Sequence, residues 1–149
     1  MRPRPNRFTT LTCAAVIAAI GIAGAAGCGG DDDSAALSRD EFVTQANAIC
    51  AAGNATIAAA VPKDGPPGPA FYETIVETTQ GTVDGVAALV PPDEMKADVD
   101  AMIADARQAL SDMRATPAAE FFASGEDPFA SVNQQAGTLG LTDCAGEEG

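Results

Sequence analysis

The first thirty residues constrain this chain most, because they decide the compartment in which the rest folds. Three arginines lie within the first seven residues, and no acidic residue precedes Asp31. An uncharged stretch covers residues 8–30, is most apolar near its middle, and has small residues at 23–27. A basic start, a short apolar centre and small residues after it are the three parts of an export signal. The sequence therefore predicts that residues 34–149 lie outside the cytoplasm.

The signal ends in a motif with a cysteine. Ala25-Ala26-Gly27-Cys28 resembles a lipobox, at which bacteria attach diacylglycerol to the cysteine and cleave the chain ahead of it, although Leu is more common than Ala at the first position. The Gly and Asp residues at 29–33 suit a flexible, well-solvated tether. We therefore expect residues 1–27 to be a cleaved signal peptide. Cys28 would then carry the lipid and hold the protein on the extracytoplasmic face of the cell membrane.

Two other interpretations of the signal remain open. The chain is an ordinary secreted protein with a free Cys28, or residues 8–30 stay in the bilayer as an uncleaved helix, since roughly 20 apolar residues span it. Ala and Gly drive insertion weakly compared with Leu or Phe, which disfavours the uncleaved helix. All three interpretations place the domain outside the cytoplasm.

The part after the signal is small and strongly acidic. Three of the eight basic residues belong to residues 1–27, whereas all 21 acidic residues follow them. The remaining 122 residues therefore hold five basic and 21 acidic side chains, a formal net charge of −16. This length suits one domain. Such a charge repels nucleic acid and anionic lipid headgroups, so we expect no nucleic-acid partner.

The four cysteines divide by position. Cys13 leaves with the signal and Cys28 takes the lipid, so Cys50 and Cys144 remain as a pair. In an oxidising compartment such a pair forms a disulfide. It would close a loop of about 95 residues, worth ~4–5 kcal/mol by chain-entropy estimates. A redox role is the alternative, but no Cys-x-x-Cys is present and no nearby basic residue lowers a thiol pKa.

Helical periodicity dominates the domain, and no stretch alternates as a strand does. Ser38-Arg39-Asp40-Glu41 fits a capping box that starts a first helix, which Pro62 stops. The prolines and glycines of 62–69 predict a loop, and a second helix follows over 70–90. Glycines at 81 and 85 weaken that helix, so we expect a bend there.

The later helices are marked by spacing and by caps. The third helix carries apolar residues three or four apart, namely Met95, Val99, Met102, Ala106, Ala109, Leu110 and Met113. Thr116-Pro117 and Asp127-Pro128 each begin a short helix, and Gly125 and Gly140 end them. The prediction is an all-α antiparallel bundle of three longer helices and two short C-terminal ones, stapled by one disulfide.

The chain contains no histidine and no tryptophan. Ser-His and Cys-His nucleophiles, histidine zinc sites, proximal-histidine haem and Glu-x-x-His di-iron sites are therefore excluded. Prolines interrupt the glycines of 65–68, so no phosphate-binding loop is present. We expect a protein that is not an enzyme, with no catalytic residue, no cofactor and no metal site.

Carboxylates offer the remaining chemistry. Asp31–Asp33 could attract calcium, but three adjacent side chains cannot all point at one ion without a folded loop, which favours a tether. Asp98, Asp105 and Asp112, with Glu94 beside them, repeat along one helix face, which is typical of an exposed face and less so of a cation site. An envelope enzyme using carboxylates alone would need one of them buried in a cleft.

A row of methionines and one asparagine each have two possible interpretations. Met95, Met102 and Met113 form either an adaptable binding surface or, as their spacing favours, core. Asn133 lies beside Val132 on the last helix, where partial burial would require a hydrogen-bond partner. We expect it to tie that helix to its neighbour, with a ligand contact as the alternative.

The order of these signals resembles a group of small exported proteins and lipoproteins of actinobacteria. The resemblance covers roughly residues 37–145 and is moderately specific when its elements are taken together. These are Asp40-Glu41-Phe42 leading into Asn47-Ala48-Ile49-Cys50, then Val90-Pro91-Pro92, Asp127-Pro128-Phe129 with Asn133, and Gly140-Leu141 ahead of Cys144. The group has no assigned activity, so the resemblance supports the bundle and the bridge and transfers no function.

Together these patterns predict a signal peptide (1–27), a lipidated cysteine and tether (28–37), a helical domain (38–145) and a disordered tail (146–149). The first functional hypothesis is a tethered, non-enzymatic module that binds a protein or another component of the cell envelope. The alternative is a carrier of a small apolar ligand, because a core of small residues leaves room for a cavity. A tight interior would favour the module, whereas a cavity lined by Val, Met and Phe would favour the carrier.

Overall fold

The structure, a computed structural model, describes residues 35–146. Across these residues every regular element is a helix, as predicted. The five helices are α1 (Arg39–Ala60), α2 (Pro69–Ala87), α3 (Asp93–Ala115), α4 (Ala118–Ser124) and α5 (Ala130–Leu139). The predicted signal peptide (1–27), Cys28 and Asp31–Asp33 lie outside the described residues, as does most of the predicted tail.

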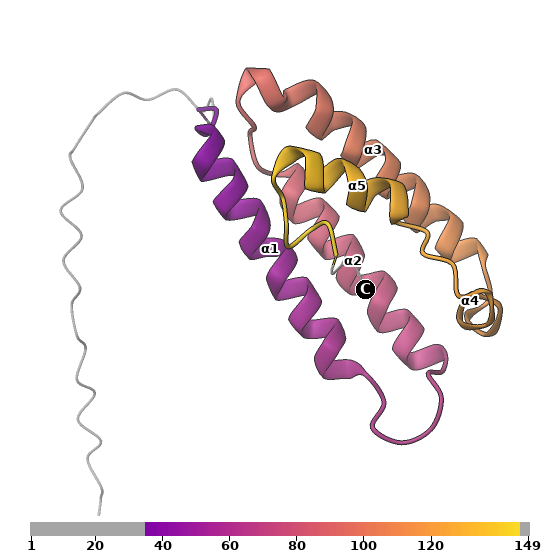
Figure 1. Ribbon diagram of the computed structural model, residues 1–149. Coiled ribbons are helices and arrows are strands. Elements are labelled where there is room, and N and C mark those ends of the chain that lie inside the picture. Colours follow the sequence, from indigo (N-terminus) through magenta and orange to yellow (C-terminus); the bar gives the residue numbers. More distant parts are fainter. Residues whose placement is uncertain (1–34, 147–149) are drawn as a thin grey trace, which may run out of the picture. The chain divides into compact units, whose positions relative to one another are not determined.

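The three long helices form one layer, in which α2 lies between α1 and α3 and runs antiparallel to both (Figure 1). α5 packs on α3 and covers one end of this layer, and α4 lies against α2 at the other end. The main core sits where α5 meets the layer. Its largest fully buried side chains are Phe42, Leu110 and Leu141.

α3 supplies most of the core, as its periodicity predicts. The whole predicted stripe is buried, and Ile103 joins it. Met95, Met102 and Met113 are each at most 4% exposed, which confirms the core interpretation of the methionine row. Asp98, which was assigned to the opposite face, is exposed.

α1 and α2 pack closely through glycines. A Cβ on Gly53 would collide with the Thr82 hydroxyl, and one on Gly85 would lie 3.1 Å from Cγ2 of Ile49. The sequence predicted a bend at Gly81 and Gly85, but α2 is continuous through both positions. Because Gly85 has no side chain, α1 can instead pack close to α2 at this position. Helix axes come closest where small residues face each other.

The boundaries of α2 differ from those predicted. Pro69 is its first residue, where a proline is favoured because its fixed φ is helical and its missing N–H would have no helical partner. The helix ends at Ala87, three residues early, because Pro91 and Pro92 follow. The extended chain before α3 pairs with the chain before α1, where the Leu37 N–H donates to the Val90 carbonyl at 2.9 Å.

α4 is held by aromatic side chains. None of its residues is fully buried, but the ring of Phe121 lies 4.9 Å from that of Tyr72, and Phe122 stacks on Phe71 at 6.2 Å. The Tyr72 hydroxyl donates to the Met113 carbonyl at the end of α3. Burial raises the pKa of the Tyr72 hydroxyl, which keeps the ring a neutral donor there.

The C-terminal segment, residues 140–146, folds back from α5 onto α1. Gly140 adopts φ +82°, a left-handed conformation that glycine adopts without strain. The Gly140 and Leu141 N–H groups donate to the carbonyls of Gly137 and Ala136, which is the predicted Schellman motif. Three residues later Cys144 forms the predicted disulfide with Cys50 of α1.

The capping box of α1 generates a first prediction. The Glu41 N–H donates to the Ser38 hydroxyl at 3.4 Å, while the Ser38 hydroxyl and N–H donate to the Glu41 carboxylate at 2.6 and 3.0 Å. Replacing an N-cap serine by alanine costs about 1 kcal/mol. We therefore expect Ser38→Ala to lower the free energy of unfolding in urea by about that amount. Ser111→Ala, at an exposed position inside α3, is the matched control and should change it little.

The same capping box depends on pH. The hydrogen bonds from the Ser38 hydroxyl and N–H hold the pKa of Glu41 below its ordinary value. A lowered folded pKa stabilises the fold above the unfolded pKa, and this is lost as the pH falls through the folded pKa. The cost of Ser38→Ala should therefore be greatest near neutral pH and shrink below the usual glutamate pKa. A cost that does not change with pH would contradict the role of the carboxylate.

The disulfide is expected to contribute a large part of the stability of the domain. It joins residues 94 apart in sequence, so breaking it releases a long loop in the unfolded chain. We expect Cys50→Ala with Cys144→Ala to lower the free energy of unfolding by about 4 kcal/mol. Urea denaturation of the natural protein in reducing agent should show a loss of the same order. A loss below about 1 kcal/mol in both experiments would contradict a major role for the bridge.

Candidate functional site

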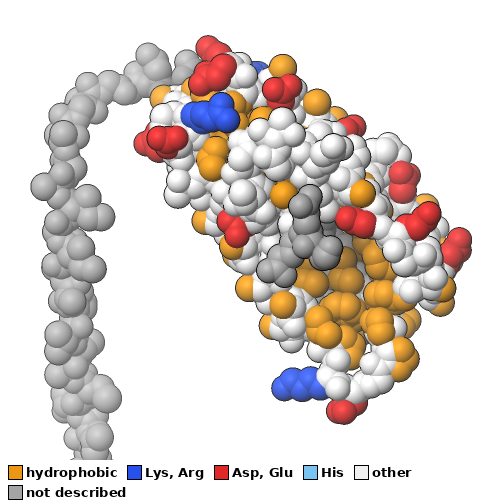
Figure 2. Space-filling model, in the orientation of Figure 1, with side chains coloured by type: hydrophobic (Ala, Val, Ile, Leu, Met, Phe, Trp, Pro, Cys, Tyr) orange, Lys and Arg blue, Asp and Glu red, His pale blue; other side chains and the backbone are white. Residues whose placement is uncertain are grey.

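An apolar cleft of about 270 Å³ lies between α1, α2, α3 and α5 and is here called the cleft. Figure 2 shows it as a patch of hydrophobic side chains open to solvent. Its large apolar side chains are Ile57, Val83, Val86, Met102, Ile103, Phe129 and Val132.

The cleft exists because α5 is too short to cover the layer. α5 has 10 residues, whereas α1 has 22 and α3 has 23. The side chains beneath the open part are also small, so they do not fill the space that α5 leaves. These are Gly53, Thr79, Thr82, Ala106 and Ala136. A cleft of this origin is part of the folded domain, and its existence requires no conformational change.

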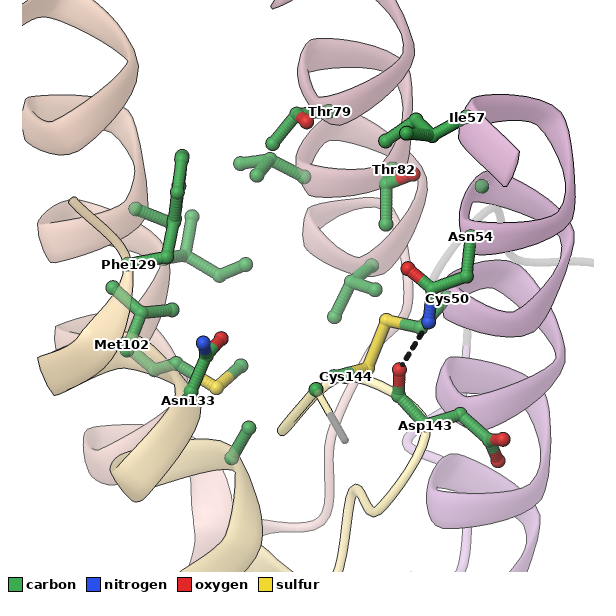
Figure 3. A pocket seen from close by; sticks show the side chains of 18 of the residues that line it. Cys50, Asn54, Ile57, Thr79, Thr82, Met102, Phe129, Asn133, Asp143 and Cys144 are labelled. Atoms are coloured by element: carbon green, nitrogen blue, oxygen red, sulfur yellow. Dashed lines mark hydrogen bonds between the residues drawn. A yellow bond between two sulfur atoms is a disulfide. The ribbon is translucent and has the colours of Figure 1, made fainter. Parts of the chain in front are cut away.

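The two sides of the cleft come from different parts of the chain (Figure 3). Phe129 and Met102 stand on one side, and Thr79, Thr82 and Ile57 stand across the open centre on the other. Thr82 uses its hydroxyl within its own helix, donating to the Thr78 carbonyl at 3.0 Å. Its methyl group and the accepting side of its hydroxyl oxygen are therefore left to contact a molecule in the cleft.

Asn133 is one of the polar side chains that line the cleft, and it stands across the open centre from the disulfide (Figure 3). Its Nδ2 donates to Oδ2 of Asp127 at 3.0 Å. Asp127 also begins α5, since its Oδ1 accepts from the Phe129 N–H at 2.8 Å. The carboxylate thus fixes both the start of α5 and the orientation of the Asn133 amide.

The disulfide and the C-terminal segment form the edge of the cleft beside α1. Asn47 Oδ1 accepts from the Asp143 N–H at 3.0 Å, and Asn54 Nδ2 donates to the Asp143 carbonyl at 2.8 Å. Both asparagines belong to α1, so amides on either side of Cys50 hold the backbone next to Cys144. The Asp143 carboxylate itself points away from the disulfide (Figure 3).

The charged side chains that line the cleft are all acidic. Asp127 and Asp143 are the charged residues that line it, and no Lys or Arg does so. Within residues 35–146 no charged or polar residue is buried, and no buried side-chain polar atom lacks a hydrogen-bond partner. The buried, unpaired carboxylate that an acid–base mechanism would use is therefore missing from the part of the chain that the structure describes.

Asn133 does not do what the sequence predicted of it. It was expected to tie α5 to a neighbouring helix, but its partner Asp127 precedes its own helix. That tie is made by Gln135, whose Nε2 donates to the carboxylate of Asp105 on α3 at 2.7 Å. The alternative, a side chain free to contact a ligand, matches the position of Asn133 in the cleft.

The other residues that the sequence singled out lie partly at the cleft and partly away from it. Cys50 and Cys144 were paired correctly, and their disulfide lines the cleft. Asp98, Asp105 and Asp112 stay on an exposed face. The roles of Asn47 and Asn54 were missed, and no spacing signal marks them, because their partners lie about 90 residues away in sequence.

Two further findings concern the described residues alone. Within residues 35–146 no group of three or more acidic or cysteine side chains is placed to hold a metal ion. None of the helices described there combines the length and the apolar character needed to cross a bilayer.

Comparisons with protein-family models, curated proteins and solved structures give no match for this chain.

Proposed function

We propose that this protein is an extracytoplasmic, lipid-anchored and non-enzymatic binding module whose cleft takes up a small apolar molecule. The cleft carries this proposal, because it is lined by Val, Met and Phe side chains and not filled by them. Of the two hypotheses from the sequence, the small-ligand carrier therefore gains over binding by a tightly packed surface.

The composition of the cleft supports binding of an organic molecule. Small-molecule sites are concave and mostly apolar, with a few placed polar groups, and typically measure ~300–1,000 Å³. The cleft, at about 270 Å³, falls just below this range, which suits a ligand smaller than a typical drug. Removing the ligand's apolar surface from water would supply the free energy, at about 25 cal/mol per Å².

The anchoring part of the proposal rests on the sequence. The lipobox resemblance at Cys28 and the Gly/Asp run after it are typical of a lipidated, tethered protein. A tether of about ten residues would keep the cleft close to the membrane surface, where apolar molecules concentrate. The net charge of −16 repels anionic headgroups and favours a domain held off the bilayer surface.

A protein partner is a second candidate occupant. The cleft is open to solvent along one side (Figure 2). An apolar side chain of another envelope protein could therefore enter it without any rearrangement, as buried anchors do at protein interfaces. Native mass spectrometry of the exported protein separates the two candidates, because a small ligand adds a defined non-covalent mass and a partner adds a whole chain.

Blocking the cleft tests the proposal directly. We expect Thr79→Trp, which places a large ring in the cleft, to weaken binding of a small apolar probe such as n-octanol at least tenfold in calorimetric titration. Thr44→Trp makes the same change at an exposed position on α1 outside the cleft and should leave binding unchanged. Equal affinity in both variants would show that the probe binds elsewhere and would contradict the proposal.

Removing the predicted lipid site tests the anchoring. The natural protein should have the mass of residues 28–149 plus that of a lipid. With Cys28→Ser the lipid mass should be lost, and because cleavage follows lipidation at this motif, the variant should keep residues 1–27. A natural protein with the mass of all 149 residues and no lipid would instead favour an uncleaved helix at residues 8–30.

A further inference from the structure

We infer that the cleft selects an amphiphile whose polar end is a hydrogen-bond donor, a hydroxyl or an ammonium group, and discriminates against the corresponding carboxylate. This inference rests on the proposed function and names the chemical class of its ligand. Two observations carry it, the fixed orientation of the Asn133 amide and the sign of the charge beside it.

The orientation of the Asn133 amide follows from its partner. A carboxylate can only accept, so the face of the amide toward Asp127 must be the NH₂ group. The amide oxygen is then left to accept, beside the second hydrogen of the same NH₂ group, and among the hydrogen bonds of residues 35–146 the oxygen accepts none. A carbonyl oxygen at the wall of an apolar cleft is satisfied by a ligand that brings an O–H or N–H group.

The negative charge beside the cleft also favours a ligand with a hydrogen-bond donor over one with a carboxylate. The Asp127 carboxylate holds the Asn133 amide and lines the cleft, and no Lys or Arg lies among the lining residues. A carboxylate on the ligand would therefore meet a like charge and an acceptor oxygen with nothing to neutralise it. An ammonium would be attracted, and a hydroxyl would be accepted without an electrostatic cost.

The apolar walls fix where the rest of the molecule lies. Met102 lies beside Asn133, whereas Phe129 and Ile57 stand farther along the cleft on opposite sides of its open centre (Figure 3). A ligand with its donor at Asn133 can therefore extend its hydrocarbon part between the two helical walls. The geometry suits one polar end and one apolar body.

Four probes with the same alkyl chain test this selection: n-octanol, octylamine, octanoate and octyl methyl ether, which cannot donate. They are titrated by calorimetry into residues 28–149 with Cys28→Ser, exported behind an ordinary cleavable signal peptide in place of residues 1–27. We expect n-octanol and octylamine to bind at least tenfold more tightly than octanoate. The ether should bind several-fold more weakly than n-octanol, because it leaves the Asn133 oxygen without a donor.

Two variants assign the selection to its residues. Asn133→Leu should weaken n-octanol binding about tenfold and leave the ether unaffected. Asp127→Asn should reduce the preference for octylamine over octanoate about tenfold. Asp98→Asn removes an equal charge from the exposed face of α3 and should leave that preference intact. Circular dichroism checks that each variant keeps its helical content.

The outcomes separate the two levels of the proposal. Octanoate binding as tightly as octylamine, in a cleft that Thr79→Trp still blocks, would overturn donor selection and leave the cleft function standing. So would an unchanged preference in Asp127→Asn. If no probe binds and Thr79→Trp changes nothing, the proposed function itself fails. A preference for octylamine lost equally in Asp98→Asn would reduce the effect to net charge and would also overturn the inference.

Discussion

The disulfide between Cys50 and Cys144 is the constraint on which the rest of the arrangement depends. It links the middle of the first helix to residues 140–146, and the amides of Asn47 and Asn54, on either side of Cys50, hold the backbone of Asp143 next to Cys144. Because this segment follows α5 directly, the same bridge keeps α5 on the layer of long helices. The position of α5 in turn determines where the layer is covered and where it stays open.

The cleft follows from a mismatch of lengths and volumes. α5 is less than half as long as α1 or α3, so part of the layer has no helix over it. A core of large side chains would fill the remaining space. Glycine, alanine and threonine at the cleft floor do not, and Phe129 and Met102 form one wall without reaching the other. An acidic residue at the start of α5, Asp127, then sets both the cap of that helix and the polarity of the cleft.

Much of the fold is readable from local patterns. The capping box at Ser38, the apolar stripe of α3 and the glycine cap at Gly140 are interactions within a few residues, and each is present in the structure. The disulfide was predictable by elimination, since the predicted export and lipidation would leave Cys50 and Cys144 as the remaining pair. The features that were predicted wrongly depend on contacts between distant parts of the chain or on which of several possible hydrogen-bond partners a side chain finds. Gly85 was expected to bend α2 but instead admits Ile49 of α1, and Asn133 bonds Asp127 while Gln135 makes the tie to α3.

The helical class, the order of the helices, the cysteine pair and the lack of histidine chemistry can all be read from composition or from spacing along the chain. That the apolar faces leave a cleft, which residues line it, and that an amide oxygen faces it depend on the folded arrangement. Those features depend on how far α5 extends over three other helices and on which acceptor the Asn133 amide finds. Periodicity tells which side of a helix is buried, but not how completely its partners cover it.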